Sequence, residues 1–299
     1  MMRKNSPDDF KSGFVAIVGA PNVGKSTLLN RLLGEKISIT SKKPQTTRNR
    51  IVGILHRPQA QIVFFDTPGV HKAVGQLNKA IVETAVSALS DVDLVLFLTE
   101  VESKDEASEN LVLRFLEKDK KPVILCLNKI DRVKKAEVLS RIDHWKSLFP
   151  FREIIPISAR NGTQMEQLIQ SMENLLPKGP PFFPPDSLTD LSERFIVSEL
   201  IREKAFRLTG REIPYSLAVT IDKFTEKPGL VSIDAVLHVE RDSQKGIVIG
   251  KGGIKLKSIG EEARKDIEAL LGTKVFLKLF VRVEKNWSKN PKALKKFGY

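Results

Sequence analysis

The chain has 299 residues, of which 41% are hydrophobic and 28% charged, and its net charge is +13. This is about twice the length of a typical domain, so we expect two compact units, and the composition is too apolar for a disordered chain. The single cysteine, Cys126, excludes a disulfide framework or a cysteine-based metal site and suits a reducing, cytoplasmic setting.

The first 176 residues predict an α/β domain. Residues 1–12 are polar, without the apolar core of a secretory signal, and we expect them to be disordered. Five short apolar runs predict strands at 14–19, 61–65, 94–99, 122–127 and 154–157. Helical spacing lies between them, as in Leu77, Ile81, Ala85 and Leu89, and again in Leu111, Leu113 and Leu116. Alternating strands and helices predict a doubly wound, mostly parallel sheet over 13–176.

A proline-rich stretch separates this domain from the rest of the chain. Five prolines between positions 177 and 185 exclude a helix or a central strand, so we expect an extended linker over 177–186. No apolar run is long enough to cross a bilayer.

Residues 187–299 predict a smaller α+β domain. A helix over 187–208 is followed by strands at 215–224 and 230–239, a glycine loop, a helix at about 254–271 and a strand at 274–283. With a short helix before the loop, the order is α-β-β-α-α-β. Residues 240–299 hold 15 Lys and Arg against 7 Asp and Glu, which favours an anionic partner. Surface solubility and anionic lipid are the alternative explanations of this charge.

The segment 19–26, GAPNVGKS, matches the P-loop pattern G-x-x-x-x-G-K-[ST] directly after the first strand. Its glycines let backbone N–H groups cradle phosphate oxygens at the start of a helix. Lys25 should reach the β and γ phosphates, and the Ser26 hydroxyl should bind Mg²⁺. The expected nucleotide contacts here are Gly19, Asn22, Val23, Gly24, Lys25, Ser26 and Thr27. The alternative is an ordinary turn.

Two further polar segments are candidates for the magnesium shell. Asp66, in Asp66-Thr67-Pro68-Gly69 at a strand end, can hold Mg²⁺ through a water, and the Gly69 N–H can sense the γ phosphate. This pattern alone is a common turn, but its place after a P-loop favours the site. In the loop 43–48, Thr47 is favoured over Thr46 as a ligand, although spacing does not separate them and a plain surface loop would look the same.

The base is predicted to be guanine. Asn128-Lys129-Ile130-Asp131 follows another strand and resembles the N-K-x-D element of GTPases. The Asp131 carboxylate can accept from guanine N1–H and its exocyclic amine together, a donor pair that adenine lacks. The pair Ser158 and Ala159 resembles the element whose backbone N–H meets guanine O6.

The second domain carries a G-x-x-G loop, which by spacing alone proves nothing. Its context is an apolar lead-in, basic residues and a following helix, which together resemble a type II KH domain, whose loop clamps about four nucleotides of single-stranded nucleic acid. The candidate RNA-binding residues are Ile249, Gly250, Lys251, Gly252, Gly253, Lys255 and Lys257. The alternative is a glycine turn between helices of a basic domain.

Together these motifs resemble the Era family of bacterial GTPases, over nearly the whole chain. The resemblance implies a GTP/GDP switch with Mg²⁺ that binds the 3′ end of 16S ribosomal RNA and assists 30S maturation. It also implies loose association with the cytoplasmic face of the membrane, and we expect a monomer.

The catalytic residues that follow from this resemblance are Lys25, Asn22, Thr47 and Gly69. Val70 stands where Ras-type GTPases have a water-orienting glutamine. In the class that the chain resembles, the P-loop asparagine, here Asn22, helps bind K⁺ beside the phosphates. Asn22 capping a turn is the alternative.

Two other functions remain open from the sequence. One is a GTPase switch in tRNA modification or protein targeting, with the C-terminal domain as a protein adaptor. The other is a non-enzymatic RNA-binding protein whose nucleotide site is only structural.

Overall fold

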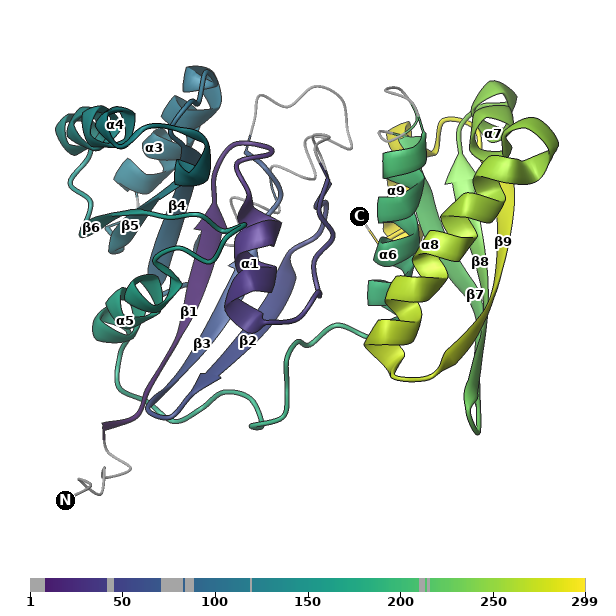
Figure 1. Cartoon of the computed structure of the whole chain (residues 1–299), viewed down its shortest axis with the longest axis horizontal. Coiled ribbons are helices and arrows are strands. Elements are labelled where there is room, and N and C mark those ends of the chain that lie inside the picture. The colour runs from purple at the N-terminus through teal and green to yellow at the C-terminus, as the bar shows by residue number, and fades with distance from the viewer. Residues whose placement is uncertain are drawn as a thin grey trace. The chain divides into compact units, whose positions relative to one another are not determined.

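The computed structural model describes residues 9–41, 46–70, 83, 89–118, 120–209, 213 and 216–298. They form two compact units, coloured from purple to teal and from green to yellow in Figure 1. The first comprises Met1–Ser38, Thr47–Ala73 and Ile81–Asp190, and the second comprises Ile39–Thr46, Val74–Ala80 and Leu191–Tyr299.

A six-stranded sheet forms the centre of the first unit, in the order β2-β3-β1-β4-β5-β6. Its strands are β1 Lys11–Val18, β2 Ile51–Arg57, β3 Ala60–Asp66, β4 Leu94–Glu100, β5 Val123–Asn128 and β6 Glu153–Pro156. All neighbours pair in parallel except β2 and β3. The predicted doubly wound, mostly parallel sheet is therefore confirmed.

Helices cover both faces of this sheet (Figure 1). They are α1 Lys25–Leu33, α3 Glu106–Lys118, α4 Lys135–Leu148 and α5 Met165–Leu175. Apolar residues of α3 and Trp145 of α4 pack with Ala16 and Val18 of β1 in one core. Every residue of β3 and β5 is buried, as strands covered on both sides require. Parallel strands bring their carboxyl ends to one edge, where the polar motifs lie.

The second unit has a three-stranded sheet, in the order β7-β8-β9, packed on α6 and α8. The elements are α6 Glu193–Leu208, β7 Ala218–Lys227, β8 Leu230–Val239, α7 Asp242–Ile249, α8 Ile254–Leu271, β9 Lys274–Val283 and α9 Pro291–Lys296. β7 and β8 are antiparallel, and β8 and β9 are parallel. The order α-β-β-α-α-β is the one predicted for a type II KH domain. Among the described residues, no helix is long and apolar enough to span a bilayer.

The structure differs from the sequence-based expectation in several places. The strand expected at 215–224 is found as β7, Ala218–Lys227. β2 was not predicted, although it contains the β-branched residues Ile51, Val52 and Ile54. The helix expected from 187 begins only at Glu193, where the Ser192 hydroxyl accepts from Phe195 N. Lys11 and Ser12, expected to be disordered, open β1, and residues 1–8 lie outside the described residues, as does most of the helix expected around Leu77–Leu89.

The proline-rich stretch packs against the first unit. The Gln61 amide accepts from Phe182 N and Phe183 N at 2.6 and 3.0 Å, and it donates to Phe183 O at 2.8 Å. Ser12 Oγ donates to Pro180 O, and Ile54 N donates to Leu188 O. These bonds hold the stretch, so the compact units divide between Asp190 and Leu191 rather than within 177–186.

Candidate nucleotide site and nucleic-acid groove

The P-loop joins the end of β1 to α1. Gly24 has φ 106°, and a Cβ there would lie 2.4 Å from Asn128 Nδ2, so only glycine fits. The first turn of α1 contains Lys25, Ser26 and Thr27, whose backbone N–H groups face the loop, as an anion site requires. Lys25 Nζ donates to Gly19 O and Ala20 O at 3.1 and 2.9 Å. The lysine ammonium therefore lies inside the cradle where phosphates would bind.

Three predicted magnesium ligands meet beside this helix. Ser26 Oγ donates to Asp66 Oδ2 at 2.7 Å and accepts from Thr47 Oγ1 at 2.8 Å. Asp66 is fully buried, and its Oδ1 has no hydrogen-bond partner among the described residues. A carboxylate and two hydroxyls suit Mg²⁺, and the unpartnered oxygen fits a metal-bound water. Mg²⁺ therefore fits this cluster of residues. Beside the hydroxyl of Ser26, the second hydroxyl of the cluster belongs to Thr47.

A further hydroxyl completes this cluster. Ser38 Oγ donates to Asp66 Oδ2 at 2.9 Å. Ser38 is held by Asn30 of α1, whose Oδ1 accepts from Ile37 N and Ser38 N at 3.1 and 3.0 Å. No motif in the sequence points to Ser38 or Asn30, because their role depends on how the chain returns to α1.

Burial sets the charge state of this cluster. It lowers the pKa of Lys25 to about 8, although the nearby Asp66 carboxylate raises it. It also raises the pKa of Asp66, against the hydrogen bond from Ser26. An anionic ligand beside Lys25 would raise this pKa again and stabilise the charged ammonium, so the site suits phosphate.

The segment after Asp66 closes on the P-loop. A Cβ on Gly69 would lie 2.7 Å from Pro21 Cα, so the two loops touch. Val70 N donates to Gly19 O at 3.0 Å, and the Val70 side chain is buried in the core. Val70 is therefore a packing residue and cannot orient a water.

Asn128 and Lys129 serve the loops around the nucleotide. Asn128 Nδ2 donates to Val23 O at 2.8 Å, and its Oδ1 accepts from Ala159 N at 3.0 Å. Lys129, in the left-handed region at φ 64°, donates to Asn22 O at 2.9 Å and pairs with Glu100. These two residues join the P-loop to the segment at Ser158 and Ala159.

Asp131 is the carboxylate that the sequence predicts to bind the guanine base. It is exposed, and its Oδ1 accepts from Ser158 Oγ at 2.6 Å. That bond is the largest cause of the lowered pKa of Asp131, so the group is ionised at neutral pH. An ionised, oriented carboxylate accepts from two neighbouring N–H groups, as guanine offers.

The predicted G-x-x-G loop lies between α7 and α8. Gly250, Gly252 and Gly253 all have positive φ, and Lys251 is exposed between them. Ile249 ends α7, and Lys255 and Lys257 lie in the first turns of α8.

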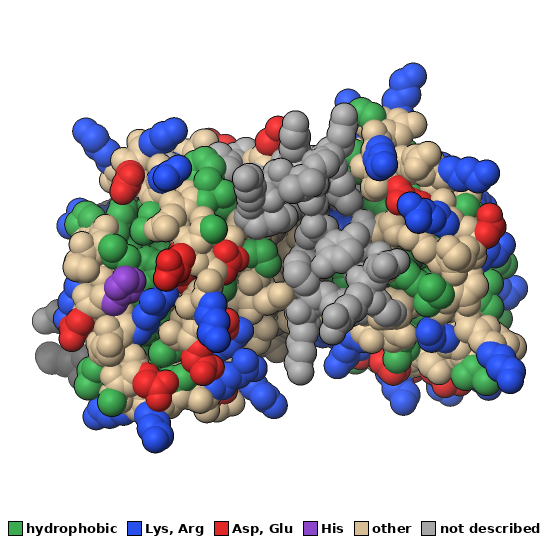
Figure 2. Space-filling view, turned by 90° about the horizontal axis from the view of Figure 1, so that it is seen from above, with side chains coloured by type: hydrophobic (Ala, Val, Ile, Leu, Met, Phe, Trp, Pro, Cys, Tyr) green, Lys and Arg blue, Asp and Glu red, His purple; other side chains and the backbone are tan. Residues whose placement is uncertain are grey.

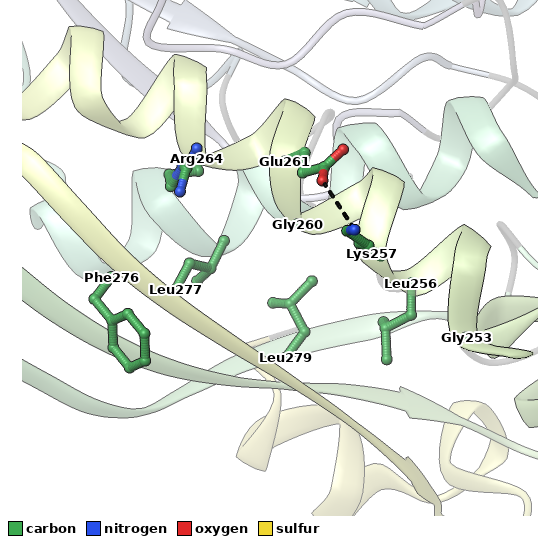
Figure 3. A pocket seen from close by; sticks show the side chains of 9 residues that line it. All are labelled: Gly253, Leu256, Lys257, Gly260, Glu261, Arg264, Phe276, Leu277 and Leu279. Carbon is green, nitrogen blue, oxygen red and sulfur yellow. Dashed lines mark ion pairs between the residues drawn. The ribbon is translucent and has the colours of Figure 1, made fainter.

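A groove of about 400 Å³ runs from this loop between α8 and β9 (Figure 3). Of the predicted residues, Gly253 and Lys257 line it. The other lining residues are Leu256, Gly260, Glu261, Arg264, Phe276, Leu277 and Leu279. Leu277 and Leu279 point toward α8 in Figure 3, while Gly260 leaves the middle of the helix without a side chain. The groove is apolar along its floor. Lys257, Glu261 and Arg264 lie at its rim, where Lys257 and Glu261 form an ion pair (Figure 3).

The sequence did not reveal most of these groove residues. Arg264, Phe276 and Leu279 lie on two elements that meet only in the folded unit. Around the second unit, Lys and Arg side chains are more widespread than acidic ones in Figure 2. This surface suits a polyanion.

Comparisons with known proteins identify the same two domains. A profile for the family "50S ribosome-binding GTPase" matches residues 14–129, and a KH domain profile matches residues 212–288. The GTPase Era of Geotalea uraniireducens is 57% identical over 291 residues, which cover 97% of this chain and 98% of that protein.

Two solved structures are similar over nearly their whole length. One is Era in complex with MgGDPNP and nucleotides 1506–1542 of 16S ribosomal RNA, and the other is an Aquifex aeolicus Era variant bound to GDP and AlF4⁻. Each has a TM-score of 0.94 and 41% identity, and covers 97% of this chain and 99% of its own.

Proposed function

Because this chain belongs to the GTPase Era family, we propose that it is a switch that binds the 3′ end of 16S ribosomal RNA and assists maturation of the 30S subunit. As a member of that family the chain is an enzyme that hydrolyses GTP to GDP with Mg²⁺. One observation of this structure carries the RNA part of the proposal, namely the groove between α8 and β9 that opens beside the glycine loop. The relative solved with the RNA segment supports the choice of RNA.

In this proposal different residues of the nucleotide site bind the phosphates and the metal ion. Lys25 holds the β and γ phosphates, while Ser26, Thr47 and Asp66 hold Mg²⁺. Bound by these residues, Mg²⁺ would supply positive charge beside the phosphate oxygens. Gly69 N–H lies on the segment that contacts the P-loop, where the γ phosphate would meet it.

Asp131 selects guanine in the same proposal. Its oriented carboxylate accepts from the base, and Ser158 keeps it in place. Asn128 and Lys129 act by holding the P-loop. Asn128 Oδ1 also accepts from the Ala159 N–H, the group that the sequence assigned to guanine O6.

Asn22 is proposed as a K⁺ ligand. It is exposed in the P-loop, with left-handed φ 64°, and Lys129 binds its carbonyl. Since buried Val70 cannot orient water, a cation beside the phosphates could supply transition-state charge. Comparing turnover in KCl and NaCl tests this: Asn22→Ala should lose a K⁺ stimulation that the unaltered chain shows, and equal rates in both salts would contradict it.

The groove proposal is tested by closing the groove without disturbing the fold. A Cβ at Gly260 would lie 3.4 Å from Leu279 Cδ1, an ordinary contact, so a longer side chain would extend into the groove. Gly260→Leu also improves helix propensity. It should therefore keep the melting temperature and GTP turnover while weakening RNA binding at least about tenfold.

The measurement is fluorescence anisotropy with a short RNA copying the 3′ end of 16S rRNA, against a scrambled RNA of equal length. Selective binding that Gly260→Leu removes would support the proposal. If both RNAs bind equally, or if Gly260→Leu binds like the unaltered chain, the groove is not the RNA site, and a protein adaptor role becomes the better account.

Peripheral association with an anionic membrane surface is a further proposal about location. The net charge of +13 supports it, since cations near a surface are attracted to anionic lipid. Co-sedimentation with anionic vesicles at physiological salt should exceed that with neutral vesicles. Equal recovery with both would contradict the association.

A further inference from the structure

The three-stranded sheet of the second unit has a face that α6 and α8 do not cover. Cross-strand register places these residues in rows on that face: Lys227, Leu230 and Lys274; Thr225, Ser232 and Phe276; Lys223, Asp234 and Lys278; Thr220, Val236 and Phe280. Figure 3 shows Phe276 on the side of β9 opposite to Leu277 and Leu279. Part of this face is buried: Val236 is 2% exposed, and beyond it the Phe297 ring of the C-terminal segment lies 4.6 Å from that of His238.

Along β9, this face alternates cations and aromatic rings. Lys274, Phe276, Lys278, Phe280 and Arg282 are all exposed, and the two phenylalanines are 50% and 51% exposed. Lys278 Nζ lies 5.4 Å from the centre of the Phe276 ring. Among the described residues, Lys274, Lys278 and Arg282 form no ion pair. We call these five residues the β9 stripe.

We propose that the β9 stripe is a second binding surface for single-stranded RNA, with bases stacked on Phe276 and Phe280 and phosphates held by the cations. Proteins that bind single strands without sequence preference combine aromatic rings, on which bases stack, with cations that follow the phosphate backbone. The rings lie four residues apart, about 13 Å along a strand, so they would meet different bases of one strand.

The surface continues the groove beside α8. β9 is the edge strand of its sheet, and Phe276 lines the groove as well as belonging to the stripe. RNA leaving the groove can therefore pass over β9 onto the stripe. This inference rests on RNA binding in the groove, which it extends from about four nucleotides to a longer segment.

The arrangement favours RNA over a membrane. Insertion into a bilayer requires apolar side chains gathered together, whereas Lys278 separates the two rings here. The face also carries Asp234, between Lys223 and Lys278 in its row, and the exposed Asp222 on β7. The nearby cations outnumber these two carboxylates, so the face remains attractive to a polyanion.

The experiment compares two RNA lengths in the full chain. Lys278→Glu/Phe280→Ser alters the stripe outside the groove, and Lys118→Glu on α3, exposed in the first unit, is the charge control. An RNA of about five nucleotides should bind the stripe variant as it binds the unaltered chain. An RNA of about twelve nucleotides should lose at least about tenfold in affinity, the size of one lost base stack.

Other results would contradict the second surface, the groove or the choice of RNA as the ligand. If the stripe variant binds each RNA as tightly as the unaltered chain does, there is no second surface. An equal loss of affinity for both lengths would mean that the changes act through the groove. If neither RNA binds the unaltered chain, or Gly260→Leu binds both normally, the groove proposal itself fails. Loss of anionic vesicle binding with unchanged RNA binding would assign the stripe to lipid. A melting temperature within a few degrees of the unaltered chain shows that the variant is folded.

Discussion

The nucleotide site and the nucleic-acid surface are built in opposite ways. Lys25 and Asp66 are 6% and 0% exposed, and each makes two hydrogen bonds within the site, while Phe276 and Phe280 are about half exposed on an open strand. A small, highly charged ligand requires a preorganised cradle that excludes water. A long polymer instead requires a path along the surface with repeated, modest contacts. Single substitutions should therefore matter far more in the first site than in the second.

The largest expected effect concerns the choice of base. Asp131→Asn removes the charged acceptor of two hydrogen bonds, each worth about 1.5–3 kcal/mol, so GTP affinity should fall by about 10²–10⁴-fold. Xanthosine triphosphate, whose carbonyl can accept from the new amide, should bind the variant better than GTP does. Competitive binding of the two nucleotides measures this. An equal loss for both would mean that Asp131 only supports the loop.

Turnover should depend nearly as strongly on the buried lysine. Lys25→Ala removes the positive group from the phosphate cradle, and we expect GTP hydrolysis to slow by about 10²–10³-fold. Lys118→Ala, an exposed lysine on α3, is the control and should hydrolyse GTP normally. Phosphate release under single-turnover conditions is the measurement, and a rate within threefold of the unaltered chain would contradict the assignment.

Substitutions of single lysines beside the groove should each have a small effect on the affinity for RNA. Lys251→Ala and Lys257→Ala each remove one exposed cation near the RNA path, and each should reduce the slope of log affinity against log salt by about 0.7. Affinity for GTP should not change. Anisotropy titrations at several KCl concentrations test this, and an unaltered slope in both variants would place the phosphates elsewhere.

The smallest expected effect is a proton taken up with the nucleotide. Because the pKa of Lys25 in the free site is about 8, roughly half of the molecules carry a neutral lysine at pH 8. Phosphates raise that pKa, so GTP binding should take up about half a proton at pH 8 and almost none at pH 6.5. Calorimetry in buffers of different ionisation enthalpy measures the uptake. Heats that do not depend on the buffer at pH 8 would mean that Lys25 is already charged.

Much of the second unit could be predicted from local pattern. β8, α8 and β9 begin and end where alternation and helical spacing predicted, because each has one buried face that imposes its period on the sequence. The P-loop and the Asn128–Asp131 segment were recognisable because phosphate and guanine require particular residues at fixed spacing.

Other features depend on contacts that no local pattern encodes. β2 contains Gly53, which weakens a strand pattern, but its pairing with β3 overrides that preference. The Cβ of an alanine at Gly53 would lie 2.7 Å from Leu29 Cδ1, so the close approach of α1 requires the glycine. Ser38 is held beside Asp66 by Asn30, and Arg264 and Phe276 line one groove because α8 packs beside β9. The roles of such residues can be recognised only when the packing of distant elements is known.

The most direct test of the account measures how the nucleotide state changes RNA binding. The Kd of the 16S 3′-end RNA would be determined by anisotropy in KCl, with GDP and with a non-hydrolysable GTP analogue. The account predicts tight, sequence-selective binding with the analogue and weaker binding with GDP. Equal, weak and salt-sensitive binding in both states would contradict a GTP-controlled RNA switch, leaving a GTPase with another target.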